Sequence, residues 1–186
     1  MSINMVKIGV VSCCGEGCLG GMISRLATRK ILDEVRPDAT VTICLPLFLT
    51  GGVEERGFVE KIPTISVDGC SKACTKSATE KYRGKLSVAI NVSDFIGKEV
   101  AEARALSTRN LTDEPNAMVE KVVSEITAKL DEVLKAYQRD LVSKDLSMAG
   151  SKPGAILYQK TFKQPKGLHK TGGGPIRGCG CGCGPQ

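Results

Sequence analysis

Short apolar runs alternate with segments of helical periodicity over most of the chain. The apolar runs cover residues 6–11, 39–45, 62–67 and 85–92, and each has the length of a buried strand. The segments between them, such as residues 22–35, place apolar residues three or four positions apart, which is typical of amphipathic helices. This alternation predicts an α/β fold with an open, mainly parallel sheet and flanking helices, in the three-layer arrangement of Rossmann-like domains.

Helices are also predicted after the third and fourth strands. Residues 70–82 form the first, with Gly84 at its C-terminal end, and residues 93–106 form the second. A long C-terminal helix follows over residues 115–142, with Pro115 in its first turn. Its apolar stripe predicts a surface that packs on the core, and it is long enough to add a dimer contact in a homo-oligomer. The stripe consists of Val119, Val122, Val123, Ile126, Leu130, Val133, Leu134, Tyr137 and Leu141.

The pattern ends near residue 142, so we predict an α/β domain over residues 1–142 and a flexible tail over residues 143–186. The tail is rich in Lys, Gly and Pro, and residues 171–175 have the composition of a linker. It holds seven Lys and Arg residues and one acidic residue, so it carries the whole net charge of +6. Because residues 1–142 are neutral overall, the sequence disfavours a nucleic-acid-binding face on the domain.

Cysteine usage and hydropathy together predict a cytoplasmic protein without a membrane span. No apolar run approaches the roughly 20 residues that a membrane-spanning helix needs. The first residues also lack the basic flank and apolar stretch of a signal peptide. The chain nevertheless contains nine cysteines, and they are clustered. In a reducing compartment, clustered cysteines indicate metal or redox chemistry rather than a disulfide framework.

The cysteines follow the ends of three predicted strands. Because ligands bind at the carboxyl edge of parallel sheets, we expect these thiols to lie close together. Thiolates are soft ligands that suit zinc or an iron–sulfur cluster. Asp68, just before the third set, is expected to cap the next helix or to act as a second-shell residue. The three sets are Cys13, Cys14 and Cys18, then Cys44, then Cys70 and Cys74.

The pair Cys70 and Cys74 also fits redox chemistry. Thiols four residues apart share a helix face, and a helix N-terminus favours the thiolate form. The alternative interpretation is therefore a thiol–disulfide or persulfide transferase, in which Cys70 attacks and Cys74 resolves. Three more thiols are found in the tail, within a Gly-Cys repeat. Such a repeat suits transient capture and transfer of a soft metal or a sulfur species. Those tail thiols are Cys179, Cys181 and Cys183.

The first turn also has the GxGxxG spacing of a dinucleotide-binding loop, in Gly15, Gly17 and Gly20. A nucleotide-binding module that uses these glycines is the second alternative. Such a site needs an acidic residue near the end of the second strand, where this chain has Thr42 and Cys44. The sequence therefore favours glycines that serve a tight turn between strand and helix.

Residues Asp68-Gly69-Cys70, followed by Cys74 and preceded by cysteines after the first two strands, resemble the DGC-domain family. The resemblance covers residues 6–92. It implies a zinc site whose ligands are one first-turn cysteine, for which we take Cys14, together with Cys44, Cys70 and Cys74. The chain differs from the family pattern in having Cys13 and Cys18 as well in the first turn, and in its cysteine-containing tail.

The sequence thus predicts a metal-binding accessory or metallochaperone protein, with zinc as the default metal and an iron–sulfur cluster as the alternative. Thiolates at the carboxyl edge of the sheet would form the site. The expected partner is a metalloprotein that accepts or donates the metal. Binding and catalysis both remain open at this point, because the same thiols serve the transferase alternative.

Overall fold

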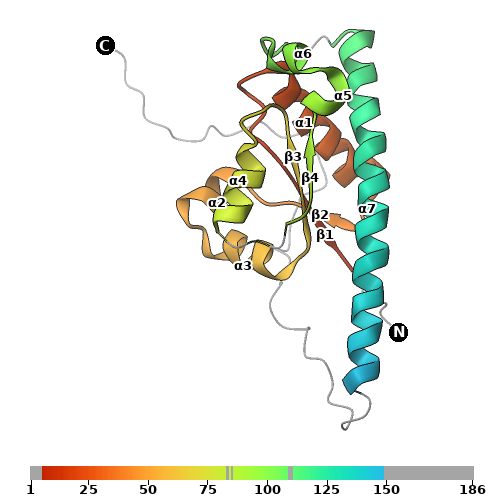
Figure 1. Ribbon diagram of the computed structural model, residues 1–186. Helices are drawn as coiled ribbons and strands as arrows, with labels where there is room; N and C mark the ends of the chain where they lie inside the picture. Colours follow the sequence, from red (N-terminus) through yellow and green to blue (C-terminus); the bar gives the residue numbers. More distant parts are fainter. Residues whose placement is uncertain (1–5, 83, 85, 109–110, 149–186) are drawn as a thin grey trace, which may run out of the picture. The chain divides into compact units, whose positions relative to one another are not determined.

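Four parallel strands form one sheet, in the order β2-β1-β3-β4 (Figure 1). The computed structural model describes residues 6–82, 84, 86–108 and 111–148. Neighbouring strands pair in register Ile8 with Thr40, Val10 with Ile65, and Val67 with Ile90. The predicted parallel sheet with flanking helices is therefore confirmed. The strands are β1 (Ile8–Ser12), β2 (Thr40–Val41), β3 (Thr64–Asp68) and β4 (Leu86–Asn91).

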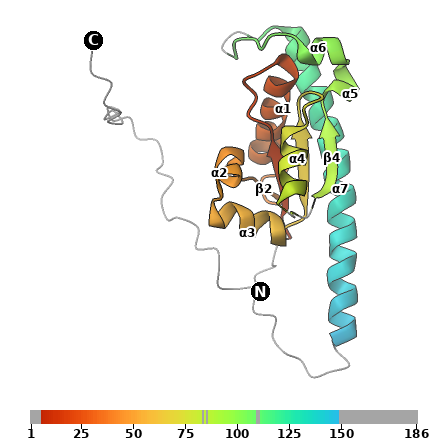
Figure 2. The same cartoon turned by 60° about the vertical axis from the view of Figure 1, so that its left-hand side comes forward.

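Helices cover both faces of the sheet, because alternate strand residues point to opposite faces (Figures 1 and 2). Helices α1 (Leu19–Lys30) and α7 (Asp113–Met148) cover one face, which is the larger apolar core. Helices α2 (Leu45–Thr50), α3 (Val53–Lys61) and α4 (Cys74–Lys81) cover the other. Fully buried residues of the first face include Ile8, Val10, Ile65, Val67, Ile126 and Leu130, and those of the second include Val11, Phe48 and Val59.

The second predicted strand is too long, and two helices after it were not predicted. Strand β2 ends at Val41, and the apolar run from Leu45 to Thr50 is helical, with Pro46 in the first turn, where its missing N–H costs nothing. Gly51 ends this helix in the left-handed conformation. A short apolar run such as this one fits either a strand or a buried helix. Here burial of Phe48 on the second face of the sheet favours the helix.

The remaining helices differ from the prediction mainly at their ends. The segment predicted as one helix over residues 93–106 forms two short helices, α5 (Ser93–Ile96) and α6 (Lys98–Glu102), because Gly97 between them has a positive φ of 89°. Helix α1 starts three residues before the predicted position and continues into a π-helical turn, η1 (Ile31–Val35). Helix α7 extends past the predicted end at residue 142, as far as Met148.

The chain divides into two compact units, residues 1–147 and residues 148–186. Most of the predicted flexible tail, with Cys179, Cys181 and Cys183, lies outside the described residues. In the part of the chain that the structure describes, every helix is too short or too polar to cross a membrane.

Candidate thiol site

The strand order places a topological switch point between the carboxyl ends of β1 and β3. The chain leaves β1 toward β2 on one side and then crosses over to β3 on the other, so the connections diverge at this point. Ligands of open α/β sheets bind at such a switch point. The turn that follows β1 carries Cys13, Cys14 and Cys18, and the turn that follows β3 carries Cys70 and Cys74.

The two turns touch through glycine backbones. A Cβ atom on Gly20, in the first turn of α1, would lie 2.1 Å from the carbonyl oxygen of Gly69. A Cβ atom on Gly69 would in turn lie 2.1 Å from the backbone nitrogen of Gly21. Only residues without a side chain permit this approach. The glycine of the Asp-Gly-Cys motif therefore lets the β3–α4 turn pack against the N-terminus of α1.

Cys13 lies next to Gly21, beside this contact, and its thiol hydrogen bonds to Ser24. Its sulfur is 3.2 Å from the hydroxyl oxygen of Ser24, and that hydroxyl donates its own hydrogen to the carbonyl of Gly21 at 2.7 Å. A serine hydroxyl has one hydrogen, so the Cys13 thiol must donate to Ser24. A Cβ atom on Gly21 would lie 3.6 Å from the sulfur of Cys13 and 3.6 Å from the sulfur of Cys18. The distance between the two sulfurs is therefore at most twice 3.6 Å.

Asp68 is buried and caps α4, as the sequence predicts. Its carboxylate accepts the backbone N–H of Thr75 at 2.7 Å and that of Lys76 at 2.9 Å. The cap uses the free amides at the start of the helix. Ala73, just before the helix, has the left-handed conformation with φ of 45°, and it completes the tight turn from Cys70 to Cys74.

Asn91, at the end of β4, fixes the Cys70 turn from the other side. Its side-chain amide donates to the carbonyl of Cys70 at 3.0 Å, and its side-chain oxygen accepts from the backbone and hydroxyl of Ser93. Both functional ends of Asn91 are therefore used. Asn91 therefore holds the backbone of the turn in place through the Cys70 carbonyl and makes no hydrogen bond to the Cys70 thiol.

The thiols of the two turns influence one another. Partial burial raises the pKa of Cys74 most, followed by the charges of Asp68, Cys13, Cys70 and Cys14. None of these influences lowers the Cys74 pKa, so the expectation that the helix N-terminus favours its thiolate is wrong. The helix N-terminus does not lower the Cys74 pKa, because the negative charge of Asp68 already occupies that end of the helix.

Cys18 shows the same effect from the other turn. Burial raises the pKa of its thiol most, a backbone hydrogen bond at Gly21 opposes this, and Cys70 raises it both as a charge and as a side-chain hydrogen-bonding partner. Cys13 adds a smaller effect of the same sign. Five predicted thiols are therefore brought together: Cys13, Cys14, Cys18, Cys70 and Cys74.

Cys44 is placed differently from the prediction. It does not end a strand but precedes the first residue of α2, and it is exposed. Among the described residues, no hydrogen bond or disulfide joins its thiol to the other five. The reason is the early end of β2 at Val41, after which the chain turns away into α2.

Two of the three glycines of the GxGxxG spacing have local functions in this fold. Gly15 has a positive φ of 84°, and Gly20 provides the close approach to Gly69. The N–H of Leu19 at the start of α1 donates to the carbonyl of Ala103 at 2.8 Å, so this amide already has a protein partner. The turn is thus explained by packing, in agreement with the interpretation that the sequence favours.

The donor set fits a soft metal by its chemistry, because all the converging side chains are thiols. All six described cysteines are unpaired, and Cys14 and Cys74 are exposed. Among the residues that the structure describes, however, no three His, Cys, Asp or Glu side chains form a ready-made metal-binding group. The thiols lie at the edge of the sheet where β1 and β3 end, but they are not arranged around a common point.

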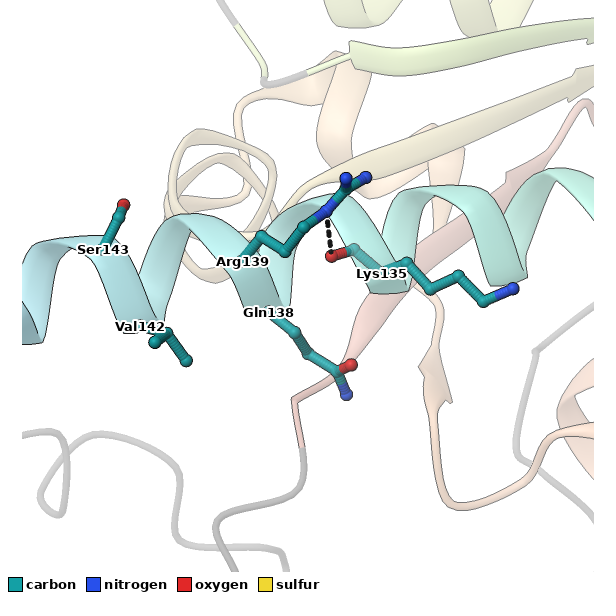
Figure 3. A pocket seen from close by; sticks show the side chains of 5 residues that line it. All are labelled: Lys135, Gln138, Arg139, Val142 and Ser143. Atoms are coloured by element: carbon teal, nitrogen blue, oxygen red, sulfur yellow. Dashed lines mark hydrogen bonds between the residues drawn. The ribbon is translucent and has the colours of Figure 1, made fainter.

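A separate hollow lies on α7, far along the chain from the thiols (Figure 3). The side chains that line it come from a single helix face, and Arg139 donates to the carbonyl of Lys135 at 3.2 Å. It contains no cysteine or acidic group. The lining residues are Lys135, Gln138, Arg139, Val142 and Ser143.

Two residues of the site were missed or undervalued in the sequence. Ser24 lies at a fully buried position of α1, and a polar residue on the apolar face of a predicted helix is the signal that could have found it. Asn91 ends a strand at the functional edge, but its bond to Cys70 spans 21 positions, and no local pattern indicates such a pairing.

A family model for the DGC domain matches residues 9–126. This chain belongs to the DGC-domain family. The match begins in β1 and ends in α7, so the DGC domain includes all six described cysteines and extends beyond the segment in which the resemblance is visible by inspection. Comparisons with curated proteins and with solved structures gave no match.

Proposed function

We propose that this DGC-domain protein binds a soft metal ion, zinc by default, through thiols at the carboxyl edge of its sheet. The observation that carries the proposal is the contact of Gly20 with Gly69, which joins the turn of Cys14 and Cys18 to the turn of Cys70 and Cys74. A divalent metal supplies the positive charge that such a group of thiols lacks. It would let them deprotonate together, and binding would release protons.

The donors best placed for this are Cys18, Cys70 and Cys74, with Cys14 as the fourth. They replace the set expected from the family resemblance, because Cys44 lies outside the group. Cys13 is a weaker donor, since its thiol hydrogen bonds to Ser24. The side chains must change rotamer to meet at one point. An iron–sulfur cluster would use the same thiols and is the alternative cargo.

Exposure supports a function in metal trafficking rather than a structural site. Structural zinc sites are closed and four-coordinate. Here Cys14 and Cys74 are exposed, and Cys18 and Cys70 are half-buried, so a partner protein could reach the metal. The partner would be a metalloprotein that gives or receives the ion through its own thiols.

Transfer of a disulfide or persulfide by Cys70 and Cys74 is the weaker proposal. A cysteine that catalyses such a transfer has a lowered pKa, and the Cys74 pKa is raised. Nucleotide binding through Gly15, Gly17 and Gly20 has less support still, because Gly20 already packs on Gly69.

The test is a zinc titration of reduced, metal-free protein prepared without oxygen. Native mass spectrometry gives the stoichiometry, and competition with a chromogenic chelator gives the affinity. We expect one zinc per chain. Because loss of an outer partner of a metal ligand costs about 10–100-fold in affinity, Cys70→Ser should weaken binding at least as much.

Cys44→Ser is the matched control, since it removes an exposed thiol from the same domain. It should leave zinc affinity unchanged. Equal affinity of the wild type and Cys70→Ser would overturn the proposed site, and absence of binding would overturn the proposed function. A brown protein with iron and sulfide after anaerobic purification would replace zinc by the cluster.

A further inference from the structure

Cys18 and Cys70 belong to different turns, and these turns touch through the backbones of Gly20 and Gly69. Cys70 raises the Cys18 pKa in two ways, as a like charge and as a side-chain hydrogen-bonding partner. Both residues are half-buried and unpaired. Two cysteines can form a disulfide only where the backbone holds their Cα atoms within about 7 Å of each other.

The backbone around the two residues is held close by independent contacts. Gly20 follows Cys18 in α1, and Gly69 precedes Cys70 in the β3–α4 turn. These glycines touch, with a Cβ position on Gly20 only 2.1 Å from the Gly69 carbonyl oxygen. Asn91 holds the Cys70 carbonyl at 3.0 Å on the opposite side. The two thiols are therefore presented by segments whose separation is fixed.

Cys74, the partner that the sequence spacing assigns to Cys70, is less well placed. Cys70 acts on the Cys74 pKa only as a charge, and its effect there is smaller than those of Asp68 and Cys13. The left-handed residue Ala73 and the Asp68 cap hold Cys74 at the start of α4.

We propose that Cys18 and Cys70 form a dithiol that a small-molecule disulfide, such as oxidised glutathione, converts into an intramolecular disulfide. This activity goes beyond metal binding and does not depend on it. The bond would join the N-terminus of α1 to the β3–α4 turn. Oxidation would also remove two of the thiols assigned to the metal.

The reaction balances as two thiol–disulfide exchanges. One thiol of the pair loses its proton and attacks a sulfur of oxidised glutathione, which forms a mixed disulfide and releases one glutathione thiolate. The second thiol then attacks the protein sulfur of that mixed disulfide and releases the second glutathione. The two protons from the protein go to the two leaving thiolates. The protein loses two electrons, and oxidised glutathione is reduced to two molecules of glutathione.

The sequence allows the disulfide to be located without ambiguity. Reduced, metal-free protein is incubated with oxidised glutathione without oxygen, quenched with acid, alkylated and digested under non-reducing conditions with trypsin and a glutamate-specific protease. Cleavage after Glu16 separates Cys18 from the two earlier cysteines, and cleavage after Lys72 separates Cys70 from Cys74. We expect the main cross-linked species to join residues 17–25 to residues 62–72.

A main product that links Cys70 to Cys74, a covalent dimer, or glutathione adducts without an internal bond would each overturn the proposal. Variants add a kinetic readout. In Cys18→Ser the glutathione adduct on Cys70 should persist, whereas Cys44→Ser should form the internal bond as fast as the wild type. The assay measures no metal, so its failure is distinct from failure of the zinc titration.

Discussion

The backbone of Gly20 lies against the carbonyl oxygen of Gly69, so the helix after the first cysteine turn and the Asp-Gly-Cys turn are in direct contact. This contact brings Cys18 and Cys70 together from opposite sides. The thiol site therefore depends on two glycines that carry no chemistry themselves.

Gly20→Ala tests this dependence. Alanine in a helix is normally favoured over glycine by about 0.5–1 kcal/mol. Here its methyl group would meet a backbone oxygen, and overpacking costs about 1–3 kcal/mol, so we expect a net loss of stability in urea unfolding. Gly17→Ala is the matched control, because no heavy atom lies within 4 Å of its Cβ position. Equal unfolding midpoints for Gly20→Ala and the wild type would contradict the packing argument.

Asp68→Asn separates the charge of the helix cap from its shape. The Asp68 carboxylate raises the Cys74 pKa, so removing its charge should lower that pKa and speed alkylation of Cys74 by iodoacetamide at pH 8. The exposed thiol of Cys44 provides an internal reference for the rate. Asp94→Asn, at an exposed acidic residue, should change neither rate. A Cys74 rate that is unaffected by Asp68→Asn would show that the carboxylate does not act on this thiol.

The stability of the reduced, metal-free protein should fall as the pH rises above the ordinary cysteine pKa. Cys18 and Cys74 hold their protons more tightly in the folded chain than in the unfolded chain. Above the ordinary pKa the unfolded chain therefore binds fewer protons, and the free energy of unfolding decreases with pH. This contribution is complete below the ordinary value of about 8.5 and is lost through the raised folded values.

The matched variant for this pH dependence is the double substitution Cys18→Ser and Cys74→Ser. Other groups titrate in the same alkaline range, so the informative quantity is the difference in slope between the two proteins. We expect a shallower fall for the double variant in chemical unfolding between pH 8 and pH 10. Parallel curves would mean that these two thiols are not the source.

Helix α7 should be held mainly by its apolar face. Ile126 is fully buried on the sheet, and Ile126→Ala should cost about 2–5 kcal/mol. Arg36 pairs with Asp131 of α7 at 3.2 Å, but both side chains are about 40% exposed, so Arg36→Ala should cost no more than about 1 kcal/mol. Urea unfolding of the two variants decides between them. A larger loss for Arg36→Ala would show that the ion pair dominates.

The alternation of strands and helices was predictable because each of these strands is a short apolar or alternating run between turns. The segment from Leu45 to Lys61 was not, since its helices are short and one contains Pro46. Their position depends on burial of Phe48 and Phe58 against the sheet, which is a tertiary effect.

The thiol site was predictable from one rule, that the carboxyl ends of parallel strands share an edge. That rule correctly groups the first-turn cysteines with Cys70 and Cys74. It places Cys44 at the end of a strand, but β2 ends at Val41, four residues before the end that the apolar pattern indicates. Nor does it reveal that the turn of Cys18 and the turn of Cys70 touch, since that depends on contact between Gly20 and Gly69.

The tail thiols provide the last prediction, which rests on the sequence alone. Met148 and Cys179 are separated by about 30 residues, which span up to about 100 Å when extended. Helix α7 has 36 residues and is about 54 Å long, so the tail has the length to return to the thiol edge. Replacing Cys179, Cys181 and Cys183 together by serine keeps this length and removes the donors. We expect zinc transfer to an apo acceptor to slow several-fold with unchanged stoichiometry at the domain. An unchanged transfer rate would remove the tail from the proposed pathway and leave the domain thiols as the complete site.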